Sequence, residues 1–196
     1  MDQLERGAVQ QEIVAPPEAG RLRGVHACMP YRSAAERRAA AGAFLAAGLR
    51  LGERCVYIAG DRWPIEIVDA LDEAGIDVPR SAAMGALRIL RAQQAYMRSG
   101  SFDPDAMMRL LRSAVADAAA SGYYGLRIAG EMEWAVGPGM APDPLLEYER
   151  RLARDVFSAG RLTGLCLYER DRFAPELLDE LASVHPVIVD PSRAAN

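Results

Sequence analysis

His26 and Cys28 are two residues apart in the apolar run HACM, residues 26–29. In a β-strand, side chains at i and i+2 point to the same face, so this imidazole and this thiol would lie together. Such a pair is able to ligate a metal or haem, or to act as base and nucleophile. The alternative is that both belong to the core of a strand, because the chain has one further histidine and no other Cys/His cluster. We expect no cofactor, no metal ligand and no catalytic residue, with haem or a metal at His26/Cys28 as the alternative.

Glu131 and Glu133 form a second pair with chemical potential, just after a predicted strand. One of them could serve as a general base or hold Mg²⁺. Alternatively, Glu131 accepts hydrogen bonds from an arginine such as Arg127 or Arg172, since buried carboxylates are usually paired. Trp134 either stacks on a ligand or fills the core.

Two further features favour structural roles. His185 precedes Pro186, and we expect it at a helix end, facing the carbonyl groups of the last turn. The charged run ERRLAR, residues 149–154, is typical of a solvated helix face.

The elements that must position these residues alternate along the chain. Apolar runs predict strands at 24–29, 55–60, 86–92, 124–132, 162–170 and 187–190. Helical periodicity predicts helices at 33–52, 63–75, 102–122, 143–160 and 174–186. Ser33 followed by Glu36 forms a capping box at the start of the first helix. Because the strands are apolar on both faces, we expect a three-layer α/β fold, with a mainly parallel sheet and helices on both faces.

In such a sheet, ligands bind beyond the carboxyl ends of the strands. The segments at these ends mix aromatic and charged residues, which suits a small organic ligand with one apolar part and one polar end. We expect the ligand to be bound by His26, Cys28, Tyr31, Arg32, Glu131, Trp134 and Arg172.

Length and charge limit the classes of function. The 196 residues fit one domain, which we place at 23–191, with a mobile N-terminal arm at 1–22 and a tail at 192–196. The net charge of −4 gives no support for direct contact with nucleic acid or with an anionic membrane. No apolar run approaches the ~20 residues of a membrane span, and no secretory signal pattern opens the chain, so we expect a cytoplasmic protein.

The chain contains no lysine, because all 23 basic residues are arginine. Schiff-base chemistry on lysine and a phosphate-loop lysine are therefore both excluded. The three cysteines are Cys28, Cys55 and Cys166, and each lies in an apolar run that favours a buried, reduced thiol.

Several motifs, in order along the chain, carry a family resemblance. They are HACMPY (26–31), FLAAGLRLGERCVYIAG (44–60), LDEAGIDV (71–78), YMRSGSFDPDAMMRLL (96–111), GYYGLRIAGEMEWAV (122–136), LLEYERRL (145–152), CLYERDRFAPELL (166–178) and HPVIV (185–189). The chain resembles the MEDS domain, the sensory domain of DcmR-type methanogen/methylotroph regulators. Residues 44–90 also resemble RecA/KaiC-type ATPases. The P-loop that precedes this region in those ATPases is degenerate in this chain, because no glycine lies between Gly24 and Gly42.

The resemblance implies a non-enzymatic sensory domain of prokaryotic signal transduction and transcription regulation. It implies a small organic ligand such as a hydrocarbon derivative, and signalling through a partner: a kinase, an anti-sigma factor, a transcription regulator or a second copy in a homodimer. One alternative is a nucleotide-binding protein or ATPase relic in which Arg32, Arg37 and Arg38 replace the phosphate-loop lysine. Another is a pure interaction module in an anti-sigma or histidine-kinase pathway.

Overall fold

One parallel sheet organises the molecule. The computed structural model describes residues 11–15, 21–60, 64–97, 101–137, 142–157 and 160–193. Within these ranges seven strands pair in the order β1-β7-β2-β6-β5-β3-β4, and all pairs are parallel. The strands are β1 (Glu12–Val14), β2 (His26–Tyr31), β3 (Arg54–Ala59), β4 (Leu87–Arg91), β5 (Leu126–Glu131), β6 (Leu162–Glu169) and β7 (Val187–Val189).

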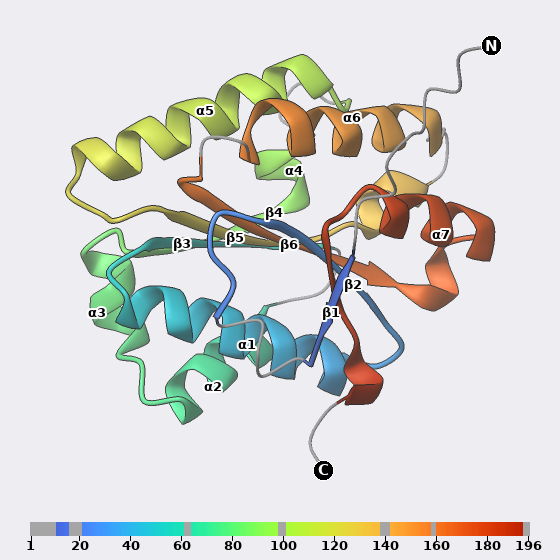
Figure 1. The fold of residues 1–196 in the computed structure, drawn as a ribbon. Coiled ribbons are helices and arrows are strands. Elements are labelled where there is room, and N and C mark those ends of the chain that lie inside the picture. The colour runs from blue at the N-terminus through green and yellow to red at the C-terminus, as the bar shows by residue number, and fades with distance from the viewer. Residues whose placement is uncertain are drawn as a thin grey trace.

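Helices cover both faces of this sheet (Figure 1). One face carries α1 (Ala34–Arg50), α2 (Ile65–Glu73) and α3 (Val78–Ala83). The other carries α4 (Ala92–Ala95), α5 (Pro104–Ala120), α6 (Pro142–Asp155) and α7 (Pro175–Ser183). Three short 3₁₀ turns are η2 (Glu133–Val136), η4 (Arg170–Arg172) and η5 (Pro191–Arg193). The predicted three-layer α/β fold is therefore confirmed.

Each face has its own hydrophobic core. Side chains of α4, α5, α6 and α7 pack on one side of the strands, and those of α1 and α2 on the other. The four central strands β2, β6, β5 and β3 are buried over most of their length on both faces, which is why their sequences are apolar without alternation. No helix in the described part of the chain is both long and apolar enough to cross a bilayer.

The predicted cap of α1 is present. The Ser33 hydroxyl accepts a hydrogen bond from the Glu36 amide at 3.2 Å, and the Glu36 carboxylate accepts one from the Arg32 amide at 2.7 Å. These contacts satisfy amide groups that the first helical turn leaves without partners. They fix where β2 ends and α1 begins.

Two elements differ from the sequence-based expectation. The predicted mobile arm, residues 1–22, contains strand β1, which extends the sheet beside β7 and buries Val14. Helix α3 follows α2 within a segment for which no element was predicted. Its signals are Asp77, whose side chain accepts from the Arg80 amide at 2.9 Å, and Pro79 in the first turn.

The register between β2 and β6 positions one group of polar residues. His26 lies opposite Gly164, and Cys28 lies opposite Cys166. A side chain at Gly164 would collide with Phe157, because a Cβ atom there would lie 2.6 Å from the ring. The glycine therefore lets Phe157 come down onto the sheet, where it stacks on the His26 imidazole at 4.3 Å between ring centroids.

Candidate functional site

The structure separates the residues predicted to form one ligand site. His26 and Cys28 share a face, as predicted, and this is the face under α6 and α7. Tyr31 belongs to the core on the α1 side of the sheet. Glu131 also lies on that side, at the carboxyl end of β5, where it contacts Arg37 of α1.

The remaining predicted residues lie elsewhere. Trp134 is buried under α5 and α6, and its ring stacks on Tyr96 with 4.5 Å between centroids. Arg32 and Arg172 are exposed. The seven residues thus occupy both faces of the sheet and the surface, and they do not line one common pocket.

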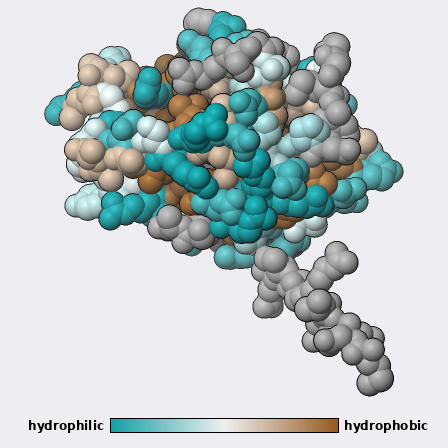
Figure 2. Space-filling model, turned by 90° about the horizontal axis from the view of Figure 1, so that it is seen from above, coloured by the Kyte–Doolittle hydropathy of each residue, from teal (hydrophilic) through white to brown (hydrophobic). Residues whose placement is uncertain are grey.

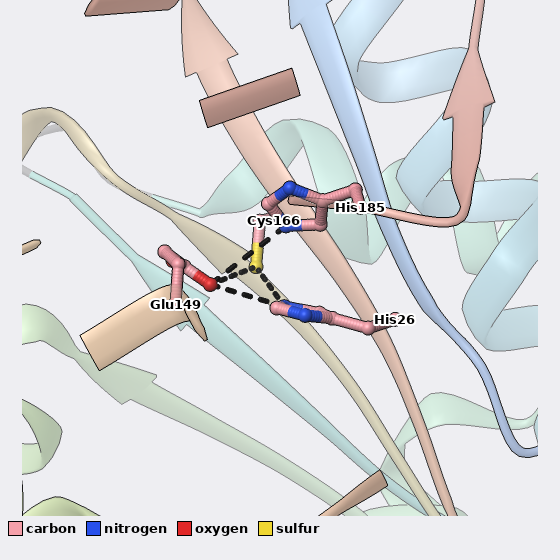
Figure 3. A group of neighbouring side chains, drawn as sticks. All are labelled: His26, Glu149, Cys166 and His185. Carbon is pink, nitrogen blue, oxygen red and sulfur yellow. Dashed lines mark hydrogen bonds and ion pairs between the residues drawn. The ribbon is translucent and has the colours of Figure 1, made fainter. Parts of the chain in front are cut away.

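Four polar side chains, three of them buried, converge in one group that includes His26 (Figure 3). His26 begins β2, Glu149 comes from α6, Cys166 from β6, and His185 from the turn between α7 and β7. Glu149 Oε2 lies 3.1 Å from His26 Nε2 and 3.7 Å from His185 Nε2. The Cys166 sulfur lies 3.3 Å from His26 Nε2, and one donor atom from each of the four residues lies within 4.8 Å of the others.

Neighbouring groups hold these side chains in place. The Tyr168 hydroxyl donates a hydrogen bond to Glu149 Oε1 at 3.0 Å. His185 Nδ1 donates to the carbonyl oxygen of Leu181 at 2.7 Å, which confirms the predicted helix-end contact. The two imidazole rings are 4.1 Å apart between centroids. Hydrogen-bond partners outside the group therefore orient Glu149 and His185.

Burial controls protonation in this group. It lowers the pKa of His26 to about 3, and burial together with the neighbouring His26 lowers the pKa of His185 to about 3. Both imidazoles are consequently neutral at pH 7, which is the form that ligates metals. Burial also raises the pKa of Glu149 and of the Cys166 thiol. The donor set of two nitrogens, one sulfur and one carboxylate suits first-row transition ions better than Mg²⁺ or Ca²⁺.

A cavity of about 30 Å³ adjoins the same group, between the sheet and helices α5 and α6. Its lining residues with polar groups are His26, Glu149 and Cys166, together with the tyrosines Tyr96 and Tyr148. Most of the lining is apolar and includes Met107, Leu111, Ile128, Met132, Leu152 and Phe157. Of the seven residues predicted to bind the ligand, this cavity includes His26.

A second polar network occupies the α1 side at the carboxyl ends of β2, β3 and β5. Glu131 accepts hydrogen bonds from the Tyr57 hydroxyl and from the Gly60 amide at 3.0 Å, and it lies 3.5 Å from Arg37. Glu131 thus contacts an arginine, as one alternative predicted, but this arginine is Arg37 of α1 and not the suggested Arg127. Arg127 instead pairs with Glu53 at 2.5 Å, within the core.

Glu133 belongs to the same network. One of its carboxylate oxygens accepts a hydrogen bond from the Tyr31 hydroxyl, and the other is buried with no hydrogen-bond partner among the described residues. Burial, followed by the charge of Glu131, raises the pKa of Glu133 to about 7. Glu133 therefore titrates near neutral pH and is chemically able to exchange a proton.

Sequence reasoning missed Glu149 and the second role of His185. Glu149 opens the run that was predicted to be a solvated helix face, yet its side chain is fully buried. The signal was its spacing from Leu145, Leu152 and Val156, which places position 149 on the apolar face of α6. His185 faces a carbonyl as predicted, but its second nitrogen points toward Glu149.

Comparison with known proteins identifies the family. No curated protein matches the chain. The family model described as "MEDS: MEthanogen/methylotroph, DcmR Sensory domain" matches residues 25–186. The match covers most of the chain and includes all four residues of the group that contains His26, as well as both acidic residues of the second network. This chain therefore belongs to the MEDS family of sensory domains.

Proposed function

We propose that this sensory domain binds a small organic molecule in the cavity between the sheet and helices α5 and α6. The observation that supports the proposal is the cavity's composition, with apolar walls and polar groups at His26, Glu149 and Cys166. Ligand sites commonly combine apolar walls with a few polar groups that fix orientation. The apolar part of the ligand contacts the methionines and leucines, and its polar end faces the polar side chains.

The size of the cavity limits the ligand. A single water needs about 10–15 Å³ of such space, so a volume of about 30 Å³ accommodates one- or two-carbon compounds with one polar group. Simple alcohols, aldehydes, amines and halogenated methanes have these dimensions. Such compounds agree with the hydrocarbon derivative that the family resemblance implies.

The outer surfaces of α5 and α6 offer a route for signalling. Seen from that side, the molecule is mainly hydrophilic, with scattered hydrophobic residues (Figure 2). The two helices are linked by an ion pair between Asp105 and Arg151 at 2.5 Å. A ligand in the cavity beneath α5 and α6 shifts the packing of these helices if it binds one of two packing arrangements more tightly than the other. A kinase, anti-sigma factor or transcription regulator bound to the outer surface of the two helices then detects the shift.

Methyl NMR of the chain labelled with ¹³C at methionine tests the proposal. Met107 and Met132 line the cavity, whereas Met29 lies in the opposite core and Met84 is exposed. Titration with a panel of one- and two-carbon compounds should shift the Met107 and Met132 signals and leave Met29 and Met84 unchanged. Equal shifts at all four residues, or none with any compound, would argue against a ligand in this cavity.

A matched pair of variants localises the binding. Leu111→Phe places a larger side chain in the cavity and should weaken binding at least tenfold. Leu110→Phe makes the same change one residue earlier in α5, outside the cavity lining, and should leave the affinity unchanged. If both variants bind like the unmodified chain, the ligand lies elsewhere.

A further inference from the structure

The group around His26 combines donor atoms from four separate parts of the chain. A strand start, a helix, a second strand and a turn each contribute one side chain, and three of the four are buried. Burying two histidines, a carboxylate and a thiol at one point is costly unless their polar atoms find partners. The partners within the protein are incomplete, because His185 Nε2, which faces Glu149, has no hydrogen-bond partner among the described residues.

The hydrogen bond of His185 fixes which of its nitrogens is free. A carbonyl oxygen only accepts, so the Nδ1 atom that contacts the Leu181 carbonyl at 2.7 Å must carry the proton. In a neutral imidazole the other nitrogen, Nε2, then presents a lone pair. When Glu149 is ionised, that lone pair lies 3.7 Å from a second electron-rich atom, Glu149 Oε2, with no hydrogen between them. A cation between them would remove the conflict.

The separations fit a tetrahedral metal site. Zinc bonds of about 2.0–2.1 Å to nitrogen and oxygen and about 2.3 Å to sulfur place neighbouring ligand atoms roughly 3.3–3.6 Å apart. Here the Glu149 oxygen is 3.1 Å from His26 Nε2, 3.7 Å from His185 Nε2 and 4.0 Å from the Cys166 sulfur. The fourth measured separation, from His26 Nε2 to the Cys166 sulfur, is 3.3 Å. These four separations differ from the tetrahedral values by a few tenths of an ångström, and the remaining two, from His185 to His26 and to Cys166, are within 4.8 Å.

The surroundings supply the outer contacts that metal ligands have. Metal-binding histidines usually donate their second N–H to a carbonyl or carboxylate, as His185 does to Leu181. Ligating carboxylates are usually hydrogen-bonded as well, as Glu149 is to the Tyr168 hydroxyl at 3.0 Å. These contacts hold His185 Nε2 and Glu149 Oε2 toward the group. Figure 3 shows how the four side chains converge.

From this geometry we infer that His26, Glu149, Cys166 and His185 bind a divalent first-row transition ion, and Zn²⁺ in particular. The mixture of imidazole, thiolate and carboxylate ligands is typical of zinc, and it excludes Mg²⁺ and Ca²⁺, which take oxygen ligands. Binding converts the Cys166 thiol to the thiolate and releases its proton to solvent. Three of the four ligands also line the cavity, so the ion lies at the cavity wall.

Metal binding is tested on the untagged full chain, without any organic ligand. After removal of metal with a chelator, dialysis against Zn²⁺ and elemental analysis should give one zinc per chain. With Co²⁺ in place of Zn²⁺, the absorption spectrum should show a sulfur-to-cobalt charge-transfer band and the intense visible bands of tetrahedral cobalt. These readouts do not depend on the sensory proposal, so one proposal can fail while the other holds.

Two cysteines in register provide a matched control. Cys166→Ser should abolish the charge-transfer band, whereas Cys28→Ser, at the position paired with Cys166 on β2, should keep it. His185→Gln should weaken Zn²⁺ binding by 100-fold or more, and Tyr168→Phe by roughly tenfold to 100-fold through loss of the outer contact. Circular dichroism establishes that each variant is folded, and His185→Gln decides the question if Cys166→Ser does not fold.

The opposite results would overturn the inference. A chain that binds no stoichiometric zinc and gives a cobalt spectrum without the sulfur band has only a buried hydrogen-bonded group at this position. Metal content that is the same in Cys166→Ser, His185→Gln and the unmodified chain would place the ion outside this group.

Discussion

The protonation of Glu133 affects the stability of the fold near neutral pH. Its pKa is raised from the ordinary value of 4.5 to about 7, first by burial and then by the charge of Glu131. The folded chain therefore binds more protons than the unfolded chain between these two values. This contribution to stability is complete below about pH 4.5 and is lost as the pH rises through about 7.

Glu133→Gln should remove this pH dependence, because the amide is neutral at every pH and its oxygen still accepts from the Tyr31 hydroxyl. A shift of about two to three pKa units corresponds to ~3 kcal/mol. The unmodified chain should lose ~3 kcal/mol of its free energy of unfolding through this group as the pH rises from about 4.5 to about 8, and the variant should not. The free energy of unfolding of the variant minus that of the unmodified chain should therefore rise by ~3 kcal/mol over this range. Urea unfolding at both pH values measures the gain. Glu176→Gln, at an exposed position in α7, is the control and should show no such change. A pH-independent effect of Glu133→Gln would contradict the assignment.

Individual residues were predictable from the sequence where one local pattern was enough. The i, i+2 spacing placed His26 and Cys28 on one face, and the position of His185 before Pro186 indicated its contact with a helix-end carbonyl. The four-residue group was not predictable, because His26, Glu149 and Cys166 meet only once the β2–β6 pairing and the packing of α6 are known. The local spacing of residues does not determine the order of strands in a sheet or the rotation of a helix about its axis.

At the scale of elements, the packing of α1 depends on a glycine in its last turns. A Cβ atom at Gly48 would lie 2.5 Å from Arg127 Cδ and 2.7 Å from the Cys55 sulfur. Arg127 is fully buried and held by the Glu53 carboxylate and by the carbonyl of Leu22, so it has little room to move. Glycine at this position lets the helix lie close against the sheet.

Gly48→Ala should therefore destabilise the domain, although alanine favours helix formation by ~1 kcal/mol. Forcing an extra carbon into a packed core costs about 1–3 kcal/mol and would also disturb the buried Arg127–Glu53 ion pair. Chemical denaturation should show a net loss of free energy of unfolding. On the exposed side of the same helix, Ala39→Gly should also lower it, by ~1 kcal/mol, because only propensity acts there. Stabilisation by Gly48→Ala would mean that α1 is able to move away from the sheet.

Most elements followed from the period of the apolar residues, and their ends from capping residues such as Ser33 and Gly75, whose φ is +76°. The exceptions were short. Strand β1 has three residues, which is too few for a periodic pattern, and it exists because β7 offers a free edge. Helix α3 had clear signals in Asp77 and Pro79, but its six residues are also too few for a periodic pattern.

At the scale of the whole molecule, the sheet separates two chemical environments. The α1 side contains the tyrosine–carboxylate network with Glu133, and the α5–α6 side contains the cavity and the four-residue group around His26. The residue before strand β1, at the edge of the sheet, contacts the turn that contributes His185 to the four-residue group. The Gln11 side chain donates hydrogen bonds to the carbonyls of Ala182 at 2.6 Å and His185 at 3.1 Å. The edge strand thus supports the turn that presents His185.

Deleting residues 1–15 should therefore loosen the α7–β7 region more than the rest of the fold. The deletion removes two backbone hydrogen bonds, from the Glu12 amide to the Pro186 carbonyl at 2.9 Å and from the Asp190 amide to the Val14 carbonyl at 2.8 Å. It also removes the buried Val14 side chain. Together these contacts contribute about 2–4 kcal/mol. Hydrogen exchange should accelerate in β7 and the turn at His185, while β3 and β5 at the centre of the sheet keep their protection. A deletion of residues 1–10, which leaves β1 in place, should exchange like the full chain. Unchanged protection of β7 after the longer deletion would show that β1 gives this edge no support.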